Sequence, residues 1–171
     1  ALLPDGRICS SQTSVLKILD VATAALTTFS HASIPNFSRS IIVLSDGRVM
    51  VGSYSTTPGP GIVYNPKTNT AVTISAPSNG YETRKLLADG TVLMIPVTAG
   101  TNAIIYDPAT DTYVTSFAIP AGQAYYASSM LRDGRVFMPA CNITTARIWD
   151  GGFGVTLSDA RLLSPYTNTS P

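Results

Sequence analysis

The chain of 171 residues is poor in charge, because only 12% of its residues are Asp, Glu, Lys or Arg, against roughly 25% in an average soluble protein. Eleven basic residues stand against ten acidic ones, which gives a net charge of +1. A protein that holds a polyphosphate backbone needs an excess of Lys and Arg. The near balance of charge excludes nucleic acid as a partner.

Histidine and cysteine are equally scarce, with one His and two Cys in the chain. Cys9 and Cys141 are too few for a disulfide framework and lack the spacing of a metal site, so we expect both to be small buried residues. We expect His31 to be an exposed or capped loop residue and not a ligand. The sequence therefore predicts no metal and no cofactor.

Long apolar runs are absent, since Gly, Pro or charge interrupts each run well before the roughly 18 residues of a membrane helix. No basic segment followed by an apolar one opens the chain, as it would in a signal peptide. We expect no membrane span.

What the chain does contain is a repeat. Asp-Gly dipeptides recur at Asp5, Asp46, Asp89 and Asp133, between 41 and 44 residues apart. A leucine lies two residues before each Asp, and a β-branched aliphatic residue lies three residues after it. Asp-Gly suits a tight turn with positive φ, and β-branched residues suit the strands that flank it. Each repeat is therefore predicted to contain a hairpin.

A second signature follows each Asp-Gly dipeptide and indicates a strand that runs into a turn. Its four copies are Ile18-Leu19-Asp20, Val63-Tyr64-Asn65, Ile105-Tyr106-Asp107 and Ile148-Trp149-Asp150. Another strand-like run follows, so one unit comprises four strands in about 43 residues. No segment has the 3.6-residue period of an amphipathic helix, and we expect almost no helix.

A four-stranded antiparallel unit that recurs four times is typical of an all-β fold, the β-propeller, whose blades pack face to face. We expect one domain, residues 1–171, with repeat units at about 1–33, 34–76, 77–120 and 121–165. Tyr64, Tyr106 and Trp149 share one repeat position and are predicted to lie in the core between blades.

The pattern Leu-x-Asp-Gly-Arg-Val followed by Tyr-Asp-Pro-x-Thr-x-Thr resembles the kelch repeat of galactose-oxidase-like propellers over about residues 1–158. The resemblance implies the propeller scaffold. It does not imply copper oxidase chemistry, because that chemistry uses several His and Tyr ligands and this chain has one histidine. Kelch propellers usually have six or seven blades, whereas this chain encodes four.

Closure of the ring involves both ends of the chain. Ala1-Leu2-Leu3 is only the end of a first strand, and the segment from Ala160 to Pro165 resembles Arg84-Lys85-Leu86-Leu87. We expect residues 159–165 to supply the missing strand, so that the two ends share one blade. The alternative is a fragment of a larger extracellular kelch protein.

Most acidic residues are committed to the predicted turns, which leaves Glu82, Asp111 and Asp159 for other work. None of these forms a close pair that would act as general acid and base. We therefore expect no catalytic residues and predict that the protein is not an enzyme.

Two groups of side chains are candidates for binding a ligand or partner. Arg7, Arg48 and Arg135 occupy one repeat position, where their planar donors would suit a carboxylate, a sulfated glycan or an acidic protein loop. The alternative is pairing with strand neighbours or with the Asp of the same hairpin. Tyr54, Tyr125 and Tyr126 form the second group, suited to stacking on sugars or anchoring a partner, with packing as the alternative.

Two functions remain open. The first is a structural or interaction module that contacts other structural proteins or copies of itself, in the virion of a bacteriophage (as decoration, fibre or tail component) or in another extracellular assembly. The second is a small lectin-like propeller that binds glycans.

Overall fold

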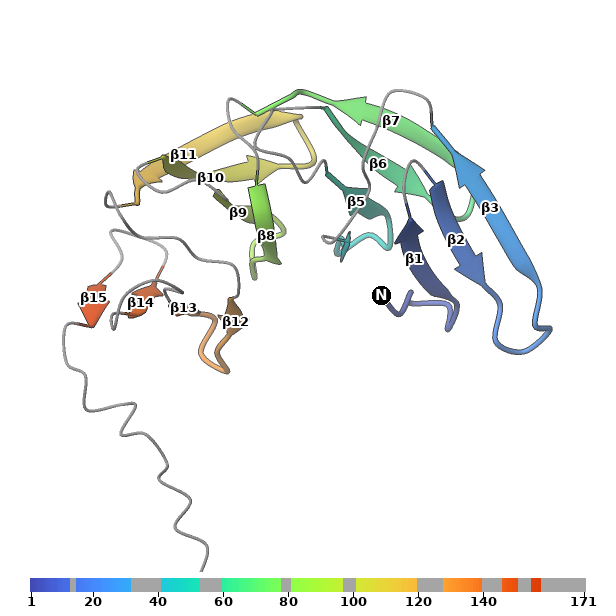
Figure 1. Ribbon diagram of the computed structural model, residues 1–171, viewed down its shortest axis with the longest axis horizontal. Helices are drawn as coiled ribbons and strands as arrows, with labels where there is room; N and C mark the ends of the chain where they lie inside the picture. The colour runs from blue at the N-terminus through green and yellow to red at the C-terminus, as the bar shows by residue number, and fades with distance from the viewer. Residues whose placement is uncertain are drawn as a thin grey trace, which may run out of the picture.

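The computed structural model describes residues 1–12, 15–31, 41–52, 60–77, 81–96, 101–119, 128–139, 146–150 and 155–157. Within these ranges the chain forms strands and no helix, and the strands build four antiparallel sheets. The sheets stand side by side as the blades of an open arc (Figure 1). The all-β propeller predicted from the repeat is confirmed, and the ring of blades is not closed.

Each blade takes its strands in chain order. Blade 1 contains β1 (Ile8–Gln12), β2 (Val15–Leu19) and β3 (Leu26–Ser30). Blade 2 contains β4 (Ile41–Val43), β5 (Val49–Val51), β6 (Gly61–Asn65) and β7 (Thr70–Ile74). Blade 3 contains β8 (Tyr81–Leu86), β9 (Val92–Pro96), β10 (Asn102–Asp107) and β11 (Thr112–Ala118). Blade 4 contains β12 (Ser129–Met130), β13 (Val136–Pro139), β14 (Ala146–Trp149) and β15 (Val155–Leu157).

Blade 1 has three strands where the others have four. In place of a fourth strand, Leu2 forms an isolated antiparallel bridge with Ile8, and the amide N–H of Cys9 donates to the carbonyl of Ala1 at 2.8 Å. Residues 1–3 are thus the end of a first strand, as the sequence predicts. Residues 159–165, predicted to complete this blade, lie outside the described residues.

The Asp-Gly turns are three-residue loops and not the two-residue type in which both central residues have positive φ. In blade 2, the Gly47 N–H donates to the Leu44 carbonyl at 3.0 Å and the Leu44 N–H donates to the Arg48 carbonyl at 2.8 Å. Only the glycine has positive φ, at 86°, as in hairpin loops that end on a left-handed glycine. Asp46 instead accepts the Arg48 N–H on Oδ1 at 2.9 Å. Its carboxylate therefore holds the turn, which explains why Asp precedes each glycine.

The core consists of three layers, each between two neighbouring blades. Because alternate residues of a strand point to opposite faces, Val49 packs towards blade 1 while Met50 packs towards blade 3. Tyr64, Tyr106 and Trp149 are 1%, 1% and 5% exposed, so their predicted place between blades is confirmed. Cys9 is a buried free thiol, as predicted. Cys141 lies outside the described residues.

Candidate functional site: the turn face

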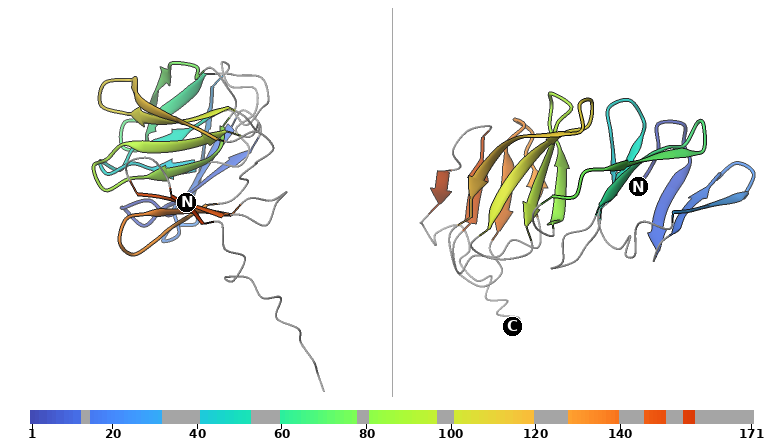
Figure 2. Two further views of the ribbon diagram at one scale, coloured as in Figure 1. Left: turned by 90° about the vertical axis from the view of Figure 1, so that its left-hand side faces the viewer. Right: turned by 90° about the horizontal axis from the view of Figure 1, so that it is seen from above.

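Two kinds of turn lie at one end of the sheets in the described chain. They are the Asp-Gly turns and the turns at the second signature, and both join neighbouring strands of a blade. Strand register places both turns of a blade at the same end. In blade 2, Val43 of β4 pairs with Val49 of β5 beside the Asp-Gly turn. Val49 also pairs with Tyr64 of β6, which lies beside the turn of the second signature. The right-hand view of Figure 2 shows these turns along one edge of the arc. We call this end of the sheets the turn face.

Arg7 contacts two turns of the turn face. Its Nε and Nη2 donate to Oδ2 of Asp5 at 3.0 and 2.7 Å, while its backbone N–H donates to Oδ1 at 3.1 Å. Nη2 also donates to the carbonyl of Pro66, in the second turn of blade 2, at 3.0 Å. The side-chain hydrogen bond from Arg7 holds the pKa of Asp5 below its usual value. Arg7 therefore ties the turns of two blades together.

The same arrangement recurs around the turn face. Nε of Arg48 lies 2.6 Å from Oδ2 of Asp46, and Nη2 of Arg135 lies 2.6 Å from Oδ2 of Asp133. In blade 3 the Thr91 hydroxyl donates to Asp89 at 2.7 Å. Each arginine is engaged by the Asp of its own turn, so an incoming anion would compete with a carboxylate already in place. That these arginines bind a ligand stays a prediction.

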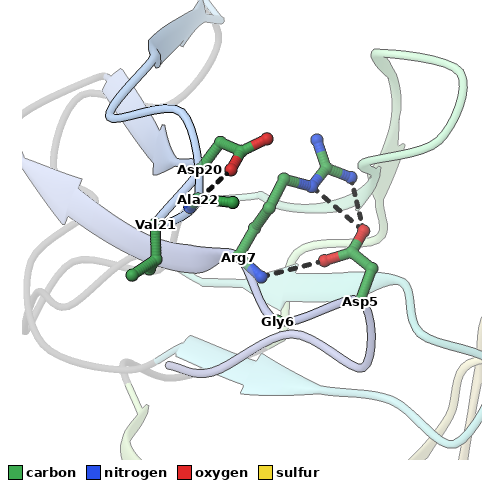
Figure 3. A pocket seen from close by; sticks show the side chains of 6 residues that line it. All are labelled: Asp5, Gly6, Arg7, Asp20, Val21 and Ala22. Atoms are coloured by element: carbon green, nitrogen blue, oxygen red, sulfur yellow. Dashed lines mark hydrogen bonds and ion pairs between the residues drawn. The ribbon is translucent and has the colours of Figure 1, made fainter.

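Two hollows on the turn face are lined by described residues. The larger, of about 570 Å³, is lined by Asp5, Gly6, Arg7, Asp20, Val21 and Ala22 (Figure 3). Asp20 is fixed there because its Oδ1 accepts the N–H groups of Ala22 and Thr23 at 2.9 and 3.2 Å. The smaller hollow, of about 290 Å³, spans blades 1 and 2 and is lined by Pro4, Asp5, Ser45, Asp46, Gly47, Pro66 and Lys67. Both hollows are open to solvent and include charged side chains in their lining.

The tyrosines of the second candidate group, Tyr54, Tyr125 and Tyr126, lie outside the described residues. The strand ends that flank Tyr54, at Val51 and Gly61, are at the opposite end of the sheets from the turn face.

Sequence reasoning missed the role of Asp111, which it left without a partner. Asp111 lies in the second turn of blade 3 with a φ of 53°, accepts the Tyr106 hydroxyl at 2.8 Å, and accepts the Ser75 hydroxyl of blade 2 at 3.2 Å. The sequence did contain a signal for this turn. Asn69 stands at the matching position of blade 2, and Asn and Asp both tolerate a left-handed conformation.

His31, predicted to be an exposed or capped loop residue, directly follows β3, is half-buried, and its ring stacks on Phe29 with centroids 6.3 Å apart. Arg84 on β8 is 5% exposed, and burial lowers the pKa of its guanidinium to about 10.

The described residues contain neither a candidate metal site nor a candidate membrane helix. No group of three or more His, Cys, Asp or Glu side chains there could hold a metal ion. Nor does that part of the chain contain a helix long and apolar enough to cross a membrane.

The comparisons with known proteins place the chain among β-propellers by structure and not by sequence. No protein-family model matches the sequence, and no curated protein matches it. The fold is similar to that of virginiamycin B lyase from Staphylococcus aureus, seen as a catalytically inactive histidine-to-alanine variant with quinupristin. That match has a TM-score of 0.76 at 9% identity and covers 91% of this chain and 53% of the lyase.

A selenomethionine form of the lyase matches with a TM-score of 0.72 at 7% identity, over 91% of this chain and 53% of the lyase. The WD40 propeller domain of Doa1 matches with a TM-score of 0.66 at 14% identity, over 85% of this chain and 47% of that one. The chain thus spans about half the length of these solved propellers. At such low identity the likeness shows the fold alone.

Proposed function

We propose that the protein is a non-enzymatic interaction module that presents the turn face of its propeller to a partner protein. The observation that carries the proposal is the repeated Arg–Asp turn pair of blades 1, 2 and 4, with contacts of 2.7, 2.6 and 2.6 Å. These pairs place guanidinium donors at regular positions on one face and hold them in fixed orientations. A surface whose side chains are already ordered loses little conformational entropy on binding.

The turn carboxylates support a non-catalytic role. Oδ1 of Asp107 accepts the Ala109 N–H at 2.8 Å, which lowers the pKa of Asp107. The hydrogen bond from the Thr91 hydroxyl lowers the pKa of Asp89. A general acid needs a raised pKa near the working pH. Carboxylates held ionised in turns are poor candidates for that role.

The lyase likeness is the strongest argument for an enzyme, and the histidine of this chain weighs against it. The lyase variant is inactive once a histidine is replaced by alanine. Here the single histidine, His31, stacks on Phe29 at the end of β3 and lines neither hollow of the turn face.

We further propose that the blades are degenerate kelch repeats and that the module belongs to an extracellular or virion assembly. The low charge of the chain and the commitment of its acids to turns support this placement. Glycan binding is the second candidate, favoured by the hollow around Arg7 and Asp20, because sugars are recognised by such fixed donors and acceptors.

Selection from a displayed library of random peptides tests the interaction module. We expect peptides that bind the wild-type chain and bind an Arg7→Ala/Arg48→Ala/Arg135→Ala variant at least about tenfold more weakly. A Lys17→Ala variant, altered on a strand away from the turn face, should bind like the wild type. Peptides that bind the triple variant equally well would overturn the turn face as the binding surface.

A glycan array with the same variants tests the second candidate. Binding that Arg48→Ala or Tyr125→Ala abolishes would support a lectin.

Turnover of quinupristin by the wild-type chain would contradict a non-enzymatic role.

A further inference from the structure

A row of apolar side chains crosses blade 1 on the face turned away from blade 2. Leu2 bridges Ile8, Ile8 pairs with Leu19, and Leu19 pairs with Leu26. Residues directly opposite each other on neighbouring strands share one face of a sheet. Ile18, next to Leu19, points the other way into the core with blade 2. We call the face with this row the leading face of blade 1.

The leading face of blade 1 is exposed, whereas the same face of every other blade is covered. Ile8 and Leu19 are 41% and 36% exposed, and the outer members of the row, Leu2 and Leu26, are 70% and 58% exposed. The residues that match Ile8 and Leu19 are 5% exposed or less: Val49 and Tyr64, Val92 and Tyr106, Val136 and Trp149. Blade 1 therefore carries an inter-blade surface that the described part of the chain leaves uncovered.

The opposite end of the arc carries the complementary surface. Phe137 and Ile148 pair across β13 and β14, and they alternate with Val136 and Trp149, which pack towards blade 3. Both are only partly buried, although the matching Met50 is fully buried. We call this side of blade 4 its trailing face.

Within the arc, trailing faces cover leading faces. Met50 and Val63 of blade 2 pack in one cluster with Val92 and Tyr106 of blade 3. The trailing face of blade 4 and the leading face of blade 1 are therefore the two halves of the interface that the arc already repeats three times. Lys17 is the one charged residue among the described strand residues of the leading face of blade 1, and its aliphatic stem can lie along an apolar surface.

We propose that a second copy of this chain completes the ring, with blade 4 of each copy docked on blade 1 of the other. The chain spans 53% of the length of a solved propeller of the same fold, so two arcs supply about one full ring. A two-fold axis through the centre of the ring, perpendicular to its plane, then relates the copies and closes the assembly. The proposal is independent of the proposed function, because the surfaces are sheet faces and not the turn face.

Light scattering on a sizing column tests the proposal on the full chain. A ring of two 18.0-kDa chains should elute as a particle of twice that mass. Leu19→Glu on the leading face and Phe137→Glu on the trailing face should each give monomers. Val72→Glu is the matched control, because Val72 is 67% exposed on β7 of a central blade, and it should leave the dimer intact.

Mixing the two monomeric variants identifies the docking mode. Each Leu19→Glu copy retains an intact trailing face and each Phe137→Glu copy an intact leading face, so the mixture should form dimers where neither variant does alone. Circular dichroism on each sample checks that the blades remain folded. A monomeric wild type, as expected if the chain's own tail covers blade 1, would overturn the proposal. So would masses above two chains, or a mixture that stays monomeric.

Discussion

The hydroxyl of Tyr106 donates a hydrogen bond of 2.8 Å to Oδ1 of Asp111. Tyr64 makes the matching contact with Asn69 in blade 2, at 2.9 Å. Both acceptors have positive φ, 53° for Asp111 and 56° for Asn69, a conformation in which Asn and Asp are enriched. A tyrosine buried between blades therefore holds the second turn of its own blade in its left-handed shape.

Replacing Tyr106 by Phe should lower the free energy of unfolding by about 2 kcal/mol, because the hydrogen bond lost has a charged acceptor. Tyr64→Phe should cost about 1 kcal/mol, since its acceptor is a neutral amide. Urea unfolding of both variants measures the difference. Equal losses would contradict a special contribution from the Asp111 carboxylate.

Stability should fall at alkaline pH. Burial raises the pKa of Tyr113 from 10.0 to about 12, and burial also raises the pKa of Tyr106. Above pH 10 the unfolded chain releases phenolic protons that the folded chain still holds, so the free energy of unfolding decreases as pH rises. Urea titrations on either side of pH 10 measure this loss. Tyr113→Phe should make the loss smaller, and an unchanged pH dependence in that variant would contradict the assignment.

Gly52→Ala should destabilise the fold by about 1 to 3 kcal/mol, the usual cost of overpacking. A Cβ at Gly52 would overlap the guanidinium of Arg84, which would have to shift within its buried site. Chemical denaturation measures the loss. In an Arg84→Met background, Gly52→Ala should lower the free energy of unfolding by less, because the shorter, unbranched methionine leaves room for the Cβ. An equal loss in both backgrounds would show that the two residues are not coupled.

Arg7→Ala should lower the free energy of unfolding by about 0.5 to 1 kcal/mol, because it removes both a partly exposed ion pair and the hydrogen bond to Pro66 of the next blade. Arg135→Ala should leave stability within experimental error. Its ion pair with Asp133 is more exposed, and solvent screens such pairs. Thermal unfolding of the two variants side by side distinguishes them, and a larger loss for Arg135→Ala would contradict the cross-blade role of Arg7.

The sequence was informative about the fold wherever the physical reason was local. Gly47 takes a φ of 86° within its own loop. Val49 and Met50 point to opposite faces of the sheet because they are neighbours in one strand. The candidate site was harder to predict from sequence, because the side-chain contacts of each arginine depend on distances in the folded chain. The distances in the folded chain place all three arginines against those carboxylates.

The sequence by itself determined the four-fold repeat, the antiparallel strands, the turn positions and the core tyrosines, because backbone conformation and the two-residue alternation of a strand act over a few residues. Only the tertiary structure decided which blade faces are covered. Leu19 and Tyr64 occupy the same repeat position, yet Leu19 is 36% exposed and Tyr64 is 1% exposed. The difference arises from the neighbour that each meets in space, since hydrophobic burial depends on packing between distant segments and not on position in the repeat.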